Sequence, residues 1–198
     1  MVLRFGVALM LALAADAASA QQTVRVSGTV VSFDHHVLAL RSTRFGDVKV
    51  NVPDNLVVFA VSKASLADIK PGSFIGVGAM PQPDGSQRAM QVTVFAESQR
   101  GLSEGHRPWN REAGATMTNA TVDTVVEAKD GETLTVKYKG GEQKIMVPRE
   151  ATILAYAIGS KDEIKAGARV AITRAVTQAD GSLSAARINV GRGEVVPQ

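Results

Sequence analysis

The chain has 198 residues, a formal net charge of +3 at pH 7 and no cysteine, which allows one large or two small domains and excludes disulfide bonds, thiol catalysis and thiolate metal sites. Its 22 basic and 19 acidic side chains are spread through both halves, without the clustered basic face that nucleic-acid binding requires. We therefore expect a protein that has no nucleic-acid partner and whose domains depend on their own apolar cores.

Residues 1–20 have the pattern of a secretory signal peptide. Arg4 precedes a nearly continuous apolar run at 5–15, and an Ala-Ser-Ala run at 18–20 provides small residues for cleavage. No later stretch approaches the roughly 18 apolar residues that a membrane-spanning helix needs. We predict an exported, periplasmic protein with no membrane span after signal cleavage.

Residues 22–95 have the pattern of a first series of short strands. Valine and threonine alternate with other residues from the start, and turns rich in glycine, aspartate or asparagine separate the alternating runs. Ser65 followed by Asp68 is typical of a helical turn with a capping box, and Gly72 ends that turn. The expected strands are 23–33, 37–42, 48–52, 56–61, 73–80 and 87–95.

Residues 116–191 repeat this order. Ile164 lies 95 residues after Ile69, and the Asp-Gly-Ser turn at 84–86 returns at 180–182. A repeat on this scale exceeds a solenoid period and indicates two similar domains in tandem. The expected strands are 121–128, 133–138, 142–147, 152–157, 169–176 and 183–190, with a helical turn after Ser160.

The pattern predicts an all-β fold. Each repeat supplies five or six short strands and one short helical turn, which suits a small closed barrel of the OB type. Closure would also remove the free edges that such strands otherwise expose, and a two-sheet sandwich is the main alternative. We predict two tandem OB-like β-barrels, over residues 22–95 and 116–191, followed by a tail at 192–198.

The segment 96–115 between the repeats, here called the connector, has no strand periodicity but holds the only tryptophan, Trp109. A flexible linker rarely carries a tryptophan, so we expect an ordered connector whose indole packs on one or both barrels. His106, Arg107 and Arg111 flank this indole. These four residues are the candidates for contact with a ligand or partner.

Several strings along the mature chain resemble a family of small exported alpha-proteobacterial proteins. They include Ser-Leu-Ala-Asp-Ile-Lys-Pro-Gly at 65–72, Arg-Gly at 100–101, Pro-Trp at 108–109 and Met-Thr-Asn-Ala-Thr at 117–121. The resemblance implies tandem OB-like domains of unknown function, and members are often labelled "metal ABC transporter permease". A permease needs several membrane helices, which the pattern after the leader excludes. The family supplies no catalytic residues.

A metal site of the Cu(I) type is the alternative that this label suggests. Met80 and Met90 are equidistant from Gly85, so a regular hairpin would place their thioethers opposite each other. His35 and His36 lie in an expected turn, and adjacent side chains do not easily share one metal ion. Methionine pairs in β-proteins mostly fill cores or edges, which favours a structural role for this pair.

The sequence lacks the common catalytic motifs. It has no P-loop, nucleophile elbow or dinucleotide fingerprint, and its aspartates fall mainly at turns, where they are selected for backbone reasons. We therefore predict a non-enzymatic periplasmic binding or scaffold protein without a cofactor, whose partner is an envelope protein or a small ligand held between the barrels. The alternative is a periplasmic metal-binding accessory protein linked to metal transport.

Overall fold

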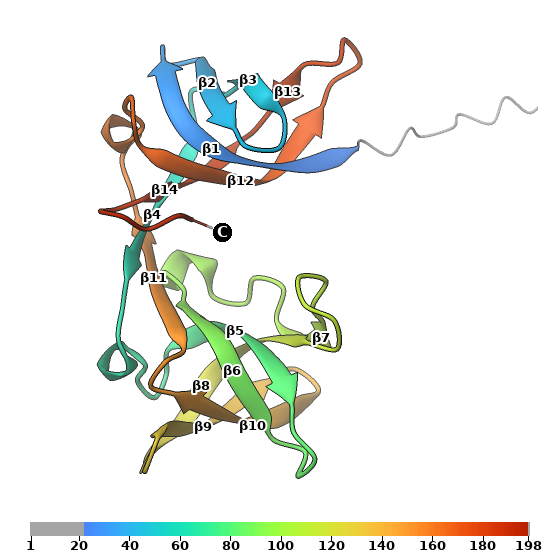
Figure 1. The fold of residues 1–198 in the computed structure, drawn as a ribbon, viewed down its shortest axis with the longest axis vertical. Helices are drawn as coiled ribbons and strands as arrows, with labels where there is room; N and C mark the ends of the chain where they lie inside the picture. The colour runs from blue at the N-terminus through green and yellow to red at the C-terminus, as the bar shows by residue number, and fades with distance from the viewer. Residues whose placement is uncertain (1–21, 198) are drawn as a thin grey trace, which may run out of the picture.

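The computed structural model describes residues 22–197 and folds them almost entirely into β-strands. Two small barrels lie one above the other and are joined by a narrow waist (Figure 1). The expected all-β fold of two OB-like barrels is thereby confirmed. The signal peptide predicted at 1–20 lies outside the described residues.

One barrel, here called the terminal barrel, is built from both ends of the described chain. Its strands form the closed ring β1-β2-β3-β13-β12-β1, in which β3 and β13 are parallel and the other neighbours antiparallel. A closed five-stranded ring of this kind is the OB architecture. Its elements are β1 (Thr23–Phe33), β2 (Val37–Ser42), β3 (Gly46–Asn51), the 3-10 turn η3 (Lys161–Glu163), β12 (Arg169–Thr177), β13 (Leu183–Ser184) and β14 (Arg187–Gly191), which also pairs with β12.

The other barrel, here called the central barrel, is continuous in sequence. Its ring is β5-β6-β10-β9-β8-β5, with β6 and β10 as the parallel pair, so it has the same architecture as the terminal barrel. Its elements are η1 (Leu66–Asp68), β5 (Phe74–Pro81), β6 (Gln87–Val94), η2 (Glu97–Gln99), β7 (Gly105–Pro108), which pairs with β8, then β8 (Thr116–Ala128), β9 (Gly131–Tyr138) and β10 (Gly141–Pro148).

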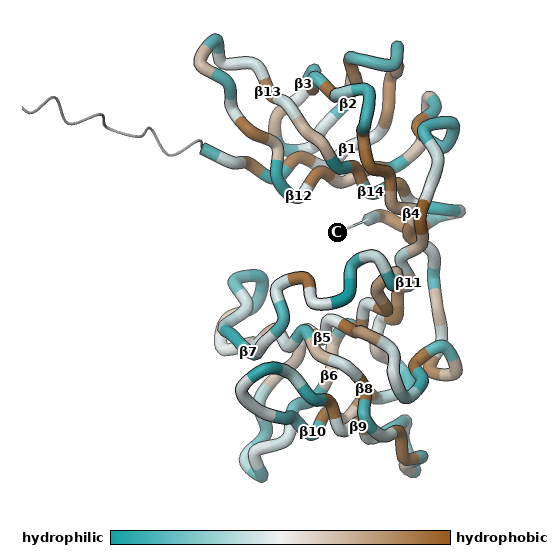
Figure 2. The backbone as a smooth tube through the Cα atoms, turned by 180° about the vertical axis from the view of Figure 1, so that it is seen from behind, coloured by the Kyte–Doolittle hydropathy of each residue, from teal (hydrophilic) through white to brown (hydrophobic). Residues whose placement is uncertain are grey.

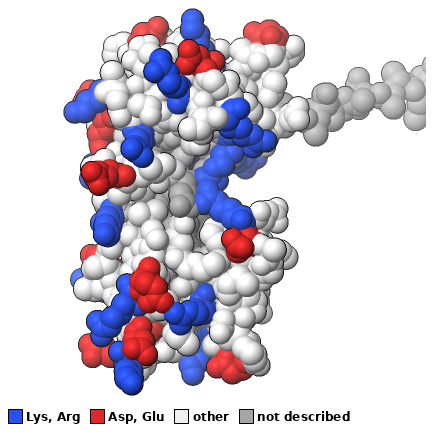
Figure 3. Space-filling model, viewed as in Figure 1, with Lys and Arg blue, Asp and Glu red and all other residues white. Residues whose placement is uncertain are grey.

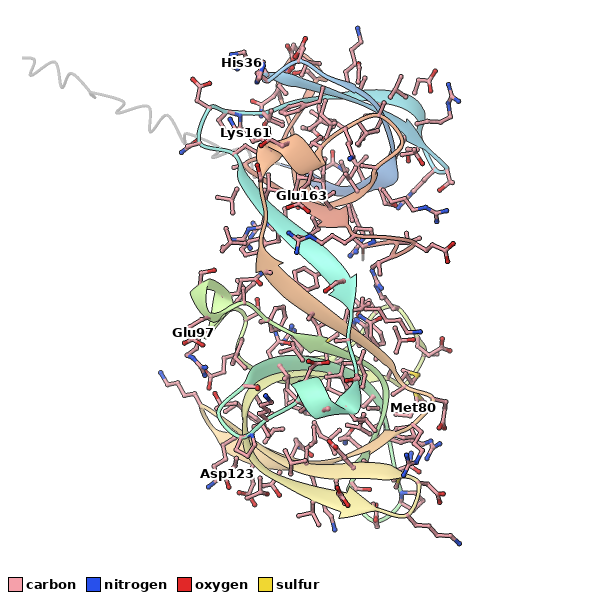
Figure 4. All side chains as sticks on the ribbon, turned by 90° about the vertical axis from the view of Figure 1, so that its left-hand side faces the viewer. His36, Met80, Glu97, Asp123, Lys161 and Glu163 are labelled. Atoms are coloured by element: carbon pink, nitrogen blue, oxygen red, sulfur yellow. The ribbon has the colours of Figure 1, made fainter. Side chains whose placement is uncertain are left out.

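Two strands form the waist. β4 (Val57–Lys63) runs from the terminal to the central barrel, and β11 (Thr152–Ile158) runs back antiparallel to it (Figure 4). β4 also pairs with β14, and β11 with β6, so one 14-stranded sheet passes through the whole molecule. Val61 lies opposite Tyr156, its own equivalent in the other repeat, so an approximate two-fold axis passes through this pair.

The expectation that residues 22–95 and 116–191 each form a barrel is therefore wrong. β4 does not fold back onto β3 but crosses the waist, so the last two strands of each repeat close the barrel of the other repeat. Equivalent core residues differ little in volume, with Ile75 and Val77 in one repeat matching Val170 and Ile172 in the other. Core volume therefore does not determine which half closes which barrel, and the path of the chain does.

The strand alternation predicts the two cores correctly. Val26, Leu38 and Ile188 belong to the core of the terminal barrel, whereas Leu134 and Ile145 belong to the core of the central barrel. Figure 2 shows hydrophobic residues along the strands and hydrophilic ones at the outer turns. Each barrel is thus stabilised by its own apolar cluster, as a chain without disulfide bonds requires.

The repeated turns have matching geometry. The backbone N–H of Ser65 donates to Asp68 at 2.8 Å, and that of Ser160 donates to Glu163 at 3.1 Å, as the capping pattern predicts. Gly85 and Gly181 follow the two turn aspartates with φ of 82° and 81°, a region that favours glycine. The capped turns and Asp-Gly turns predicted from the repeat therefore form as expected, although the strands that close each barrel come from the other repeat.

Strand bounds differ most from expectation at two places. β8 begins at Thr116 instead of 121 because its first residues pair with both β5 and β7. The expected strand 183–190 divides into β13 and β14 because its partner changes. The backbone N–H of Ala185 donates to the carbonyl of Asn51, at the end of β3, at 2.9 Å. The carbonyl of the next residue, Ala186, accepts from the N–H of Val57 in β4 at 3.0 Å.

Candidate functional site

A cleft of about 200 Å³ lies between the two barrels, close to the waist. Here called the interbarrel cleft, it receives side chains from both barrels, from β11 and from the connector. Figure 3 shows basic side chains gathered along the notch between the barrels. The lining residues are Arg25, Gln91, Thr93, Phe95, Gln99, Leu102, Trp109, Arg111, Met117, Tyr156, Thr173, Arg187 and Asn189.

Equivalent faces of the two barrels form the opposing walls. Val58 and Ile153 are equivalent positions of the two repeats. Ile188 pairs with Val58 and Val92 pairs with Ile153, so Ile188 and Val92 are equivalent too, as are their neighbours along each strand. The β5–β8 ladder of the central barrel is likewise equivalent to the β12–β1 ladder of the terminal barrel, so paired positions in one have counterparts in the other. The equivalent pairs in the cleft, terminal barrel first, are Arg25 and Met117, Arg187 and Gln91, Asn189 and Thr93.

The connector and the residue before it, Phe95, lie on the central barrel through two aromatic rings. A Cβ added at Gly78 would lie 2.5 Å from the indole of Trp109, and one at Gly76 would lie 2.8 Å from the ring of Phe95. The backbone N–H of Trp109 also donates to the carbonyl of Ala115 at 2.8 Å. The two strand glycines thus permit a close approach of rings to the sheet, since any side chain there would displace them.

Three guanidinium groups define the electrostatics of the cleft, because no aspartate or glutamate is among its lining residues. Arg111 lies over the Trp109 ring at 5.8 Å, and Arg187 lies over Phe59 at 5.3 Å. Burial, and then the charge of Arg111, lower the pKa of Arg25. Within residues 22–197, no carboxylate lies at ion-pair distance from Arg25 or Arg187. The cleft therefore holds concentrated positive charge.

Neutral donors complete the wall. Asn189 is only 5% exposed, and its side-chain amide makes no hydrogen bond to any other described residue. Burial raises the pKa of the Tyr156 hydroxyl, although the charges of Arg25 and Arg111 act in the opposite direction. Tyr156 therefore stays protonated at neutral pH. The Asn189 amide is therefore a neutral donor that a bound group could use beside Arg25 and Arg187.

The structure separates the four connector residues that the sequence singles out. Trp109 and Arg111 line the cleft. Arg107 lies on β7 and donates to the carbonyl of Ser103 at 2.9 Å. His106, also on β7, lies with its Nδ1 2.8 Å from the Thr118 hydroxyl and its ring stacked on Tyr138. These last two are not among the cleft residues.

The lining residues that sequence reasoning missed include Arg25, Tyr156, Arg187 and Asn189. They belong to β1, β11 and β14, which are far apart in the chain. An arginine at an outward position of an alternating strand is an ordinary solvated residue. Only the exchange of strands between the barrels turns these positions toward one another.

The methionine pair does not form as expected. Met80 lies opposite Arg88 instead of Met90, because the hairpin is centred on Asp84 and not on Gly85, with Gln82 bonded to Ser86 across the turn. The register shift between Gly78 and Ala79 then leaves Met90 as the extra residue of β6, without a partner in the ladder.

The histidines lie in the other barrel. His35 and His36 form the turn between β1 and β2, with His36 Nδ1 3.8 Å from Asp54. Figure 4 shows His36 in the upper barrel and Met80 in the lower one. The structure therefore does not bring the four suggested metal ligands together. Among residues 22–197, no group of three or more His, Cys, Asp or Glu side chains has a metal-binding arrangement.

A larger hollow of about 1000 Å³ lies at the waist, against the start of η1 and the tail after β14. Its charged residues have both signs, with Lys63 and Arg149 beside Glu150 and Glu194. Mixed charge of this kind selects no particular ligand. The smaller interbarrel cleft is therefore the better candidate site.

Comparison with protein-family models, with curated proteins and with solved structures gave no match to this chain. Within the described residues, no helix has the length and apolar character needed to cross a bilayer.

Proposed function

We propose that this protein is a non-enzymatic binding protein that holds an anionic group in the interbarrel cleft. The observation that carries the proposal is the convergence of Arg25 and Arg187, beside Arg111, on a cleft whose described lining residues include no aspartate or glutamate. A guanidinium presents a planar fork of donors that matches carboxylate and phosphate oxygens. The Asn189 amide would add a neutral donor to the same group.

The size of the cleft limits what enters it. Its volume of about 200 Å³ is below the roughly 300–1,000 Å³ of typical small-molecule sites. A carboxylate or phosphate group fits such a space, and the remainder of a larger ligand would lie outside it. The cleft also lacks histidine, serine and acidic side chains, so no base stands beside a nucleophile there. This composition supports binding over catalysis.

We include export to the periplasm in the proposal, on the strength of the leader pattern at 1–20. Mass spectrometry of the protein purified from its own cells should find a mature amino terminus at or near Gln21. Recovery of the full-length chain from the cytosol alone would contradict export.

Replacing cleft arginines is expected to weaken anion binding. Arg25→Gln or Arg187→Gln should each weaken the binding of glutarate by about tenfold, because a hydrogen bond to a charged group contributes about 1.5–3 kcal/mol. Binding should also weaken as salt is added. Calorimetric titration measures both effects. Arg44→Gln is the matched control, since Arg44 lies in the exposed β2–β3 turn over Phe45. Equal losses in all three variants would count against the cleft.

A further inference from the structure

We propose that the anionic group in the cleft is an acidic side chain on an extended segment of a partner protein, and that this segment lies on the terminal barrel as the connector lies on the central barrel. The inference rests on the proposed anion site and names the class of its ligand. Three observations lead to it: the covered face of the central barrel, the open equivalent face of the terminal barrel, and the small volume of the cleft.

The covered face is on the central barrel, where the chain's own connector lies across β5 with Trp109 packed on Gly78. It is held there by polar contacts as well. Asn119 of β8 donates to the carbonyl of Leu102 at 2.9 Å, and Arg100 donates to the carbonyl of Gly72 at 2.9 Å. An irregular segment with an aromatic anchor therefore already binds this type of sheet face.

The equivalent face of the terminal barrel is open. Thr173 takes the place of Gly78, and Arg25 and Arg187 take the places of Met117 and Gln91. All three terminal-barrel residues are exposed, whereas Met117 and Gln91 are partly buried. The described tail packs on the end of β14, at Gly191, and its Val196 borders a hollow beside Ser27 and Thr29 of β1, whereas none of its described residues lines the interbarrel cleft.

The chemistry of the open face defines its partner. Arg25 and Arg187 require negative charge and have no acidic partner among residues 22–197. Trp109 and the exposed Leu102 border the same cleft and favour an apolar or aromatic side chain. The cleft itself admits only one acidic side chain, so the rest of the segment must lie over the face. A protein segment that alternates acidic and aromatic residues satisfies all of these conditions.

The test compares three probes on the full mature chain. They are the peptide Ac-Glu-Phe-Glu-Phe-Glu-NH2, the same peptide with glutamine in place of glutamate, and free glutarate. We expect the acidic peptide to bind at least about tenfold more tightly than glutarate, because its backbone and rings contact the face as well. The glutamine peptide should lose most of this affinity. Trp109, the only tryptophan, reports binding through its emission.

A blocking variant locates the binding face. Thr173→Trp places an indole where the connector's indole lies on the other barrel, and because Thr173 also lines the cleft it should weaken the binding of both the peptide and glutarate, as measured by calorimetry. Thr124→Trp is the matched control, at an exposed threonine of β8 on the central barrel and outside the cleft. Arg25→Gln should weaken binding of both the acidic peptide and glutarate.

The outcomes separate the two proposals. Glutarate binding as tightly as the peptide would overturn the partner segment and leave the anion site standing. Peptide binding that is unchanged by Thr173→Trp would also overturn it, because the peptide would then bind elsewhere. Failure of both probes to bind would overturn the anion site itself.

Discussion

A chain cut once in the connector is expected to remain a single particle. A protease site inserted after Ala113 divides the protein between β7 and β8, in an exposed loop. Each barrel then consists of strands from both fragments, and the two fragments share the β1–β12, β5–β8 and β4–β11 ladders. Separation would open both cores to water. Size-exclusion chromatography with light scattering should therefore find one species with the mass of the intact protein.

The cut sample provides its own control. In denaturant the fragments should separate, which shows that cleavage was complete. Elution of two small species in native buffer would contradict the exchange of strands, because independent tandem barrels would part as soon as the connector is broken. Interfaces that complete a core are much larger than those of transient complexes, so dilution alone should not release the fragments.

Fragments cut out of the chain are expected to differ in whether they fold alone. Residues 64–153 are expected to fold alone as a monomeric barrel, because they contain every residue of the central core, from Ile69 to Ile153. The two ends of this fragment meet, since the N–H of Ala64 donates to the carbonyl of Ile153 at 2.9 Å. Circular dichroism and a cooperative thermal transition should show a folded β-protein.

Residues 22–95 are the matched comparison. This fragment follows the sequence repeat but contains only part of each core, so it should not form a folded monomer. The physical reason is that a barrel lacking two of its five strands leaves two open edges and an exposed core. If the 22–95 fragment folded as a monomer and the 64–153 fragment did not, each repeat would form its own barrel, which contradicts the observed topology.

The candidate site was only partly accessible from sequence. Trp109 stands out because a lone tryptophan in a segment without strand periodicity is unusual, and Arg111 is its neighbour in the chain. Arg25 and Arg187 carry no such signal. They are 162 positions apart and meet only because β1 and β14 belong to one barrel. The methionine pair was predicted from symmetry about Gly85, but the hairpin is centred one residue earlier, on Asp84, so Met80 faces Arg88.

The sequence by itself determined the inward face of nearly every strand, the two Asp-Gly turns, the serine-capped helical turns and the repeat. Each of these depends on contacts within a few residues or on alternation along one strand. The tertiary structure alone decided which strands pair. The backbone donors and acceptors at a strand edge are the same for every sequence, and the equivalent core residues of the two repeats differ little in volume. The crossing of β4 and β11 therefore decides which half closes each barrel, and with it which side chains meet in the interbarrel cleft.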